Sequence, residues 1–469
     1  MNALQSLKFF LPETFLLCGA FFALFLDLFI KNKKSIGALS LVVLVATAFL
    51  AKSPGVSMPL FFGFFTLDPF THFFRLLALG IVAITVLVSM SYKPLQKNEG
   101  EYYSLFLFMA FALILMASAT NLLMIFLGME FVSVLSYLLV GFLKKDPKSK
   151  EAAIKYFLFG SLCSGIMLYG ISILFGISGS LDLMVIKKSI TPSSAVLALT
   201  SLVFFLTGLG FKISMVPFHM WAPDVYESAP TPVTGFLTVG PKALGFALLI
   251  RILAFTFSSL SFKWHAPIMF LSIMTMTIGN ILAISQVNIK RLLAYSSIAQ
   301  AGYILMGIAV FNDTGITGVF IYLLAYAFTN LGAFVTVIAC SNDLGTDDIS
   351  AYSGLSKRSP FLAFCMTLFM LSLAGIPPMA GFIGKFYVFS SAIEKGFITL
   401  AVAAAINSAV AAFYYFKVVR LMYLVEPIHE EPIKHSAPIV FALCLLVAGI
   451  LILGIFPAPF INFLHGILV

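Results

Sequence analysis

Long apolar runs separated by short polar loops repeat along the whole chain of 469 residues. A membrane-spanning helix needs about 20 mostly apolar residues, and the first such run extends from about Phe9 to Ile30. Further runs are centred near residues 45, 80, 110, 132, 165, 205, 243, 275, 300, 328, 370, 408 and 447. The pattern therefore predicts an all-α polytopic membrane protein with about fourteen transmembrane helices and no sizeable soluble domain.

The composition agrees with this pattern, because 61% of the residues are hydrophobic and only 10% are charged. Soluble domains carry about 25% charged residues, so a soluble enzyme, a disordered chain and a disulfide-stapled secreted domain are excluded. The short alternating segments of a membrane β-barrel do not produce such runs either. The five cysteines are isolated within apolar stretches and show no metal-ligand spacing.

The net charge of +9 would suggest a nucleic-acid partner in a soluble protein. Here the basic residues lie in short loops, where they set the orientation in the lipid bilayer, and no nucleic acid is expected to bind. With the N-terminus outside, the inner loops hold fourteen basic residues. The outer loops then hold five, namely Lys52, Lys187, Lys188, Lys263 and Lys395. This bias predicts an even number of spans with both termini on the outer side.

Two of the apolar runs are interrupted by Gly and Pro and carry a lysine beside the interruption. The seventh contains Gly208-Leu-Gly-Phe-Lys212 and then Pro217, and the twelfth contains Gly375-Ile-Pro-Pro and then Lys385. They are five spans apart, and an odd offset inverts the second copy in the membrane. Paired broken helices in inverted repeats indicate a transport site near the bilayer midplane.

The chain is accordingly divided into four segments. Residues 1–100 are expected to form three N-terminal transmembrane helices, and residues 101–257 a first five-helix repeat comprising spans four to eight. Residues 258–425 are expected to form the inverted second repeat, spans nine to thirteen, and residues 426–469 the C-terminal span fourteen.

Four ionisable residues lie in the middle of predicted spans: Glu130, Lys212, Lys242 and Lys385. Placing one ionisable residue at the centre of a membrane helix costs about 2.5–3.5 kcal/mol, so such residues usually mark pathways for ions or protons. Because a carboxylate favours the charged form of a buried lysine and desolvation opposes it, a Glu–Lys pair can act as a proton switch. Together the four residues predict a proton relay that crosses the protein within the membrane plane.

Each member of the set also has a structural interpretation. Glu130 could form an interhelix ion pair, and Lys212 could bind carbonyls freed at the helix break. Lys242 and Lys385 could extend their ammonium groups to the membrane surface. Two supporting candidates, Lys155 and His219, also have two interpretations each. Lys155 could feed protons to Glu130 or anchor its helix at the interface. His219 could pass protons between Lys212 and Lys242, or lie at the interface beside Trp221.

Other charged residues carry less functional signal. Arg251 is expected to be paired or to reach the surface, and Glu13, Asp27, Asp68 and Arg75 lie towards the ends of spans.

Motifs for cofactors or metals are missing from the sequence. There is no GxGxxG, and Gly384-Lys385 fails as a phosphate loop because Phe386 occupies the position of the required Ser or Thr. His429-Glu430-Glu431 is not an HExxH zinc motif. No cofactor or metal is therefore expected in this chain, and any redox chemistry must reside elsewhere.

A family resemblance rests mainly on residues 211–234, Phe-Lys-Ile-Ser-Met-Val-Pro-Phe-His-Met-Trp-Ala-Pro-Asp-Val-Tyr-Glu-Ser-Ala-Pro-Thr-Pro-Val-Thr. This stretch resembles the signature of the proton-conducting membrane family that comprises the antiporter-like subunits of respiratory complex I and the Mrp cation/proton antiporters. It is most similar to one complex I branch, because the other branches and the Mrp proteins favour Leu-Pro-Asp-Ala after the tryptophan. Matching stretches at Lys155-Tyr-Phe-Leu-Phe-Gly, Asn288-Ile-Lys-Arg-Leu-Leu-Ala-Tyr-Ser-Ser-Ile-Ala-Gln and Leu373-Ala-Gly-Ile-Pro-Pro-Met-Ala-Gly-Phe-Ile-Gly-Lys385 extend the resemblance over nearly the whole chain.

The resemblance implies a role for each of the four central residues. Glu130 matches the fifth-span glutamate of the family's channel, and Lys212, Lys242 and Lys385 match its seventh-, eighth- and twelfth-span lysines. It further implies a hetero-oligomeric complex in a bacterial inner membrane, in which this chain lies beside other membrane-arm subunits. NADH, flavin, iron–sulfur clusters and quinone would be used by other subunits, and electron transfer there would drive proton translocation here.

Three alternatives remain at this point. The chain could belong to a Mrp-type cation/proton antiporter, or to a related membrane-bound hydrogenase or other-donor quinone reductase. It could also be an inert scaffold, which the four intact ionisable positions argue against because their insertion cost would serve no purpose.

Overall fold

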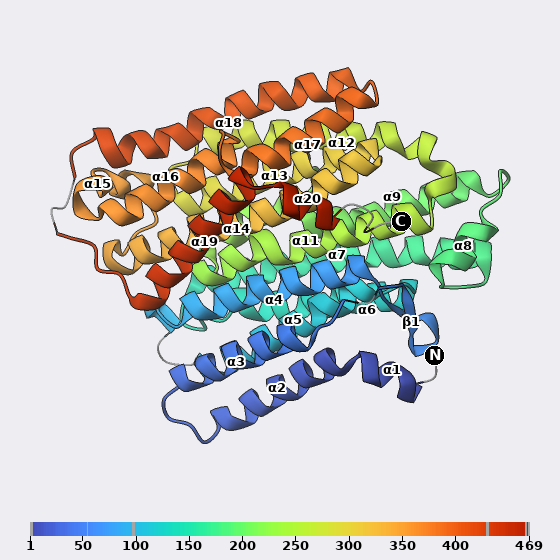
Figure 1. Cartoon of the computed structure of the whole chain (residues 1–469), viewed down its shortest axis with the longest axis horizontal. Helices are drawn as coiled ribbons and strands as arrows, with labels where there is room; N and C mark the ends of the chain where they lie inside the picture. Colours follow the sequence, from blue (N-terminus) through green and yellow to red (C-terminus); the bar gives the residue numbers. More distant parts are fainter. Residues whose placement is uncertain (1–2, 54, 96–98, 428–430, 465–466, 468–469) are drawn as a thin grey trace.

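The computed structural model describes residues 3–53, 55–95, 99–427, 431–464 and 467. Most helices run roughly along the long axis of the molecule (Figure 1), and the N-terminal helices lie on the side of the bundle opposite α18. The N-terminal part consists of α1 (Ala3–Phe9), α2 (Leu11–Asp27), α3 (Lys34–Leu50), β1 (Met58–Leu60), η1 (Phe61–Gly63), β2 (Phe65–Leu67), α4 (Pro69–Ser89) and η2 (Lys93–Leu95).

Two further groups of helices follow. The first comprises α5 (Glu99–Ser118), α6 (Leu122–Val140), α7 (Pro147–Ser178), α8 (Leu183–Ser189), α9 (Ala195–Ile213), α10 (Trp221–Ser228) and α11 (Thr231–Phe255). The second comprises η3 (Ser258–Leu260), α12 (Ser261–Ile284), α13 (Ile289–Val310), α14 (Asp313–Leu344), η4 (Ile349–Tyr352), α15 (Leu355–Arg358), α16 (Pro360–Ala374), α17 (Ala380–Glu394) and α18 (Ile398–Leu424). Then α19 (Ala437–Ile455) and α20 (Ala458–Leu464) cross in front of α14 (Figure 1).

The predicted all-α class of a multi-pass membrane protein is confirmed. Within the described residues, eleven helices are long and apolar enough to cross a membrane, or twelve if α1 and α2, which meet at 78°, form one span. The apolar helices α3 and α16 fall short of the length criterion. One small departure is the antiparallel hairpin β1–β2, whose turn is made by Phe61, Phe62 and Gly63 at positive φ. It lies in the loop between two predicted spans, where the pattern of long apolar runs predicts no secondary structure.

Helices α11 and α13 form the centre of the bundle. The apolar windows of both are completely buried within the chain, whereas only 33% of the window of α7 and of α19 is buried. Close approach in this region depends on glycine: a Cβ on Gly279 of α12 would lie 2.6 Å from the backbone nitrogen of Ala299 on α13. Small residues allow such packing between membrane helices. The central position of α11 and α13 places their polar side chains away from lipid.

Helices α9 and α16 end in the same way, at a residue in the left-handed conformation. Ser214 and Gly375 adopt left-handed conformations with φ of 56° and 84°. The next amide then bonds back to the last turn, Met215 to the Gly210 carbonyl at 2.8 Å and Ile376 to the Leu371 carbonyl at 3.0 Å. This is the Schellman arrangement. The chain then turns into α10 after the first break and into α17 after the second.

Candidate functional site

Glu130 lies in the middle of α6, a helix whose start is set by the Asn121 side chain accepting from the Leu123 amide at 3.0 Å. Its carboxylate is half-buried and accepts a hydrogen bond from the Ser164 hydroxyl of α7. A neighbouring helix therefore supplies the first partner of this carboxylate, as expected, but that partner is a hydroxyl group and not a cation.

Lys212, one residue before the end of α9, is almost completely buried. Its ammonium donates to the Ser133 hydroxyl at 2.7 Å, and that hydroxyl donates to the Met129 carbonyl at 2.8 Å. Ser133 follows Glu130 by three residues, so the two share one face of α6. Among the described residues, no ion pair within 4.0 Å joins Glu130 to Lys212. The structure thus brings both groups to the same face of α6, with a serine as the direct contact.

Lys242 follows Pro241 within α11 and is buried at the centre of the bundle. Its ammonium donates to the Ser297 hydroxyl at 2.9 Å and to the Ser297 carbonyl at 3.2 Å, both on α13. The ring of Tyr226 lies 5.7 Å from the same nitrogen. A lysine held in this way does not reach the membrane surface.

Lys385 on α17 binds the end of the preceding helix. Its ammonium donates to the carbonyls of Leu373 and Ala374, at 3.1 and 2.8 Å, and to the Ser408 hydroxyl at 2.9 Å. The ring centre of Tyr303 is 4.8 Å away. Because the last carbonyls of a helix have no partner within the helix, Lys385 acts as a cap for α16. The cap considered for Lys212 is therefore found at the second break.

A row of polar groups links the surroundings of Lys242 and Lys385. Ser296, next to Ser297, lies 2.5 Å from the Tyr415 hydroxyl, oxygen to oxygen. The Gln300 amide donates to that hydroxyl and to the Leu373 carbonyl, both at 3.1 Å. Lys385 donates to the same carbonyl. Hydroxyl and amide groups can both give and accept hydrogen bonds. Among the described residues no hydrogen bond joins the side chains of Ser296 and Ser297, so these groups form an interrupted row of polar side chains between the two lysines.

The two supporting residues are placed differently. Lys155 is half-exposed and pairs with Glu151 at 2.9 Å and with Asp224 at 3.3 Å. It precedes Ser164, the partner of Glu130, by nine residues, or about 13 Å along α7. His219 is buried between α9 and α10, and its Nδ1 atom has no hydrogen-bond partner among the described residues. The structure brings neither side chain into hydrogen-bonding contact with the four central residues.

Asp224 joins three helices through an ion-pair network. Arg291 at the start of α13 lies 2.8 Å from both Asp224 and Glu227 of α10, and Lys155 reaches Asp224 from α7. Burial raises the pKa of the Asp224 carboxyl, but hydrogen bonds from Arg291 and Lys155 outweigh this effect and leave the pKa below its usual value. The network holds α10, the segment after the first helix break, against α7 and α13.

Two buried ion pairs involve the N-terminal part: one joins two of its own helices, and the other joins it to α11. Arg75 of α4 pairs with Glu13 of α2, and both side chains are almost fully buried. Arg251 of α11 lies 3.2 Å from Asp68 and donates to Thr71 at 3.0 Å. The expectation that Arg251 is paired is confirmed. These pairs fasten helices together and contact none of the four central residues directly.

Sequence reasoning missed direct partners of the central lysines, such as Ser133 and Ser297, and the polar residues Gln300 and Tyr415 that lie between Lys242 and Lys385. Ser133 could have been found, because it lies one helical turn after Glu130. The other three face the lysines from distant parts of the chain, and no spacing rule relates them to those lysines.

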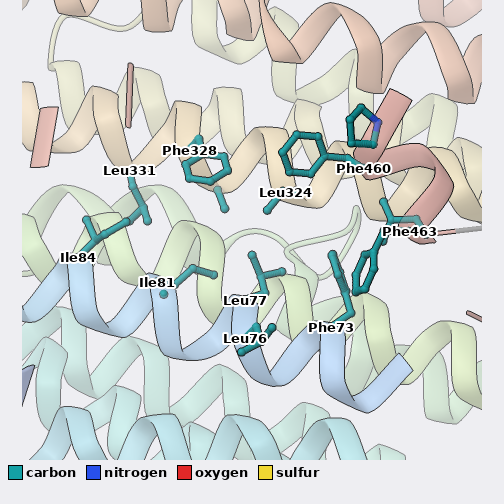
Figure 2. A pocket seen from close by; sticks show the side chains of 14 residues that line it. Phe73, Leu76, Leu77, Ile81, Ile84, Leu324, Phe328, Leu331, Phe460 and Phe463 are labelled. Carbon is teal, nitrogen blue, oxygen red and sulfur yellow. The ribbon is translucent and has the colours of Figure 1, made fainter. Parts of the chain in front are cut away.

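A cavity of about 470 Å³ opens between α4, α14 and α20. Figure 2 shows Leu77 and Ile81 of α4, Phe328 of α14, and Phe460 and Phe463 of α20 around it. All its lining side chains are apolar, so this cavity offers no group for proton transfer.

Comparison with known proteins identifies similar chains. Residues 119–411 match the family model described as NADH:quinone oxidoreductase/Mrp antiporter, TM. Over 468 residues the chain is 41% identical to NADH-quinone oxidoreductase subunit N of Trichlorobacter lovleyi, covering 98% of this chain and 96% of that protein.

Two solved structures have the same fold. A chain of respiratory complex I from Thermus thermophilus with bound aureothin is 30% identical, with a TM-score of 0.83 and coverage of 96% of this chain and 98% of that one. A chain of the membrane-bound sulfane sulfur reductase, an archaeal respiratory complex, is 24% identical, with a TM-score of 0.89 and coverage of 97% and 96%. At that identity the second likeness shows the fold alone. The resemblance drawn from residues 211–234 is confirmed.

Proposed function

Because the chain belongs to the NADH:quinone oxidoreductase/Mrp antiporter membrane family, we propose that it is a proton-translocating membrane-arm subunit, of the subunit N type, in a NADH–quinone oxidoreductase. The observation that carries this proposal is the set of three buried lysines, each bound to neutral oxygen acceptors. Charged groups in membrane helices are costly and normally mark pathways. A row of such groups within one bundle is suited to moving protons.

The proposed cycle begins at Lys212, which loads a proton from the inner side while Glu130 stabilises the charged form. Ser133 contacts the ammonium and lies one turn from the carboxylate, so a small movement of α6 relative to α9 changes the distance between the charges. When the influence of Glu130 weakens, the proton passes to Lys242. It then follows the polar row through Ser296, Tyr415 and Gln300 towards Lys385 and leaves on the outer side.

The two supporting residues have lesser roles in this proposal. Lys155, which is paired with Asp224 and Glu151, serves the entry side of the relay through the ion-pair network. His219, whose ring nitrogen is buried and unpartnered within the described residues, is positioned to accept a proton as α10 moves.

We further propose fourteen spans and two inverted repeats, with residues 1–100, 101–257, 258–425 and 426–469 as the four segments. Several matched features support the repeats. Helices α7 and α14 each have 32 residues and end at a left-handed glycine, Gly179 and Gly345. Isolated β-bridges join Asn121 to Asp182 and Asn288 to Asp348, at corresponding places near these helices. The break between α9 and α10 corresponds to the break between α16 and α17.

Partners, cofactors and location follow from the same proposal. The solved neighbours are chains of multi-subunit membrane complexes, and we expect this chain to bind other membrane-arm subunits in a hetero-oligomer. NADH, flavin, iron–sulfur clusters and quinone would bind other subunits, which supply the translocase with energy. The complex would lie in a bacterial inner membrane with both termini of this chain on the periplasmic side.

A second candidate is a subunit of a Mrp-type cation/proton antiporter, because the matching family model includes those proteins. The same lysine row would then exchange protons for another cation without electron transfer. Related membrane-bound hydrogenases and quinone reductases with other electron donors differ from the main proposal only in the partner subunits. Purification of the intact complex with a NADH–quinone assay separates these possibilities.

Replacement of Glu130 or Lys212 by alanine tests the relay. Proton uptake by vesicles should fall at least about tenfold per NADH oxidised, since a positioned proton-transfer group contributes a factor of this size or more. The complex should still assemble, which subunit composition on native gels will check. Lys187→Ala, at an exposed helix end, is the control. Normal pumping in both the Glu130 and the Lys212 variant would refute the relay.

A further inference from the structure

One face of α18 carries two positive charges that have no protein partner. Lys417 and Arg420 lie in the last two turns of this helix, where Lys417 is half-buried and Arg420 is exposed. Among the described residues, neither side chain forms an ion pair or a hydrogen bond. The nearby acidic residue Glu426 is bound to Lys357 at 2.6 Å. Cations near the end of a membrane helix extend towards the interface, where groups from outside the chain can pair with them.

The surface around these cations is apolar and open to lipid. A cleft of about 560 Å³ is lined by Phe413, Phe416, Lys417, Val419, Arg420, Tyr423 and Leu424. The aromatic side chains Phe413 and Phe416 are 63% and 45% exposed, and Leu424 is 78% exposed. The opposite face of α18 is buried through Tyr414, Tyr415, Val418 and Met422, so the cleft is on the outer surface of the bundle.

We propose that this cleft binds an anionic phospholipid, with the headgroup phosphate on Lys417 and Arg420 and an acyl chain along Phe413 and Phe416. The charges lie nearer the helix end and the two phenylalanines lie further into the span, which matches the polarity of a lipid. Lys417 is about 10 Å from the end of α18, and its flexible stem, extended along the helix, shortens the remaining distance to a headgroup.

The surroundings favour lipid over an acidic protein segment. A protein carboxylate would have to be desolvated beside exposed phenylalanines, and burying a charge pair in this way gains little net stability. A lipid phosphate is already at the membrane surface. Basic pockets on membrane helices are suited to anionic headgroups, because each basic residue near the membrane surface attracts them.

The experiment uses the intact complex, reconstituted in phosphatidylcholine vesicles that contain a photoactivatable phosphatidylglycerol with its diazirine near the headgroup. Mass spectrometry of the irradiated complex should find the label on residues 413–424. The double variant Lys417→Gln with Arg420→Gln should reduce this label about tenfold, because two attractions of a few-fold each are lost. The variant Lys187→Gln with Lys188→Gln, which removes the same charge from α8, should leave it unchanged.

Two further measurements make the outcome decisive. A photoactivatable phosphatidylcholine should label residues 413–424 weakly, and equally in wild type and double variant. The charge-preserving variant Lys417→Arg with Arg420→Lys should retain the label, even if the glutamine variant fails to assemble. Equal labelling by both lipids, unchanged labelling in the glutamine variant, or a cross-link between Lys417 and an acidic segment of another subunit would overturn the proposal. None of these outcomes depends on whether the complex pumps protons.

Discussion

The two helix breaks place a lysine in different surroundings. At the first break, between α9 and α10, the ammonium of Lys212 has one hydrogen-bond acceptor among the described residues, the Ser133 hydroxyl. At the second, between α16 and α17, the ammonium of Lys385 has three acceptors, two of which are carbonyls at the end of α16. The first lysine contacts a neighbouring helix, and the second closes the break in its own span.

This difference separates two roles that the sequence could not distinguish. A charged group that several acceptors hold is difficult to move, because its departure breaks several charge-assisted hydrogen bonds at once. A group that one serine holds can change its partner at low cost. In the proposed relay, Lys212 is therefore the more suitable switch, and Lys385, the proposed end of the proton path, is also a structural cap.

The largest expected effect is that of Lys212→Arg on proton transport. The guanidinium keeps the positive charge but does not release a proton in proteins, so transport per NADH oxidised should fall at least about tenfold. Proteoliposome assays with a pH-sensitive dye will measure this ratio, with Lys187→Arg as the control. Pumping at the wild-type ratio in the arginine variant would show that Lys212 acts only as a fixed charge.

The second prediction concerns stability. Lys385→Met removes the charge-assisted hydrogen bonds to the carbonyls of Leu373 and Ala374, which keep one neutral donor each, Gln300 and Ser408. A hydrogen bond to a charged group is worth about 1.5–3 kcal/mol. Lys212→Met removes an equally buried ammonium but frees only a serine hydroxyl. The Lys385 variant should therefore be about 2 kcal/mol less stable than the Lys212 variant, measured as a lower thermal midpoint of the assembled complex. Equal midpoints would contradict the assignment of Lys385 as a cap.

A smaller effect is expected when the hydroxyl beside Lys212 is removed. Ser133→Ala deletes the acceptor of the ammonium, a bond worth about 1.5–3 kcal/mol when one partner is charged, and proton transport should fall by roughly tenfold or less. Ser136→Ala is a matched control one turn further along α6, since its buried hydroxyl also donates to a carbonyl four residues back, at 2.6 Å. An equal loss of proton transport in the Ser133 and Ser136 variants would contradict a specific role of the Ser133 hydroxyl beside Lys212.

The smallest effect belongs to the network that holds α10. The lowered pKa of Asp224 means that its ionised form adds stability above its ordinary pKa, and that this stability is lost as the pH falls through the lowered value. Asp224→Asn should remove this acid-induced loss. At neutral pH it should cost only about 0.5–1 kcal/mol, because the network is partly exposed to water.

Thermal midpoints between pH 3 and pH 7 will reveal this difference, with Glu151→Gln as the control for the exposed partner of Lys155. An asparagine variant that keeps the wild-type pH dependence would show that another group is responsible.

The sequence predicted much of the fold, because a bilayer requires each span to satisfy its own backbone hydrogen bonds and to expose apolar side chains. The lengths of the apolar runs alone therefore indicate where the spans lie, as they do for α11 and α13. The hairpin β1–β2 and the short helix α8 lie in loops, where this constraint does not act. Helices α3 and α16 are shorter than the usual span, so counting spans by length remained uncertain.

The candidate site was predictable only in part. Glu130, Lys212, Lys242 and Lys385 are conspicuous because charges are rare in such a chain. Their direct partners Ser133, Ser297 and Ser408 are ordinary serines, and polar residues of this kind are frequent in membrane helices. Only the tertiary structure selects them, because it brings a serine of α6 to Lys212, a serine of α13 to Lys242 and a serine of α18 to Lys385.

The sequence by itself therefore determined the membrane class, the family and the identity of the four central charges. These depend on local properties: the length of apolar runs, the insertion cost of an ionisable residue, and the order of residues in a motif. Only the tertiary structure decided what each charge contacts. It showed that Lys212 binds a serine of α6 while Lys385 caps α16, because a hydrogen bond depends on distances between helices far apart in the sequence.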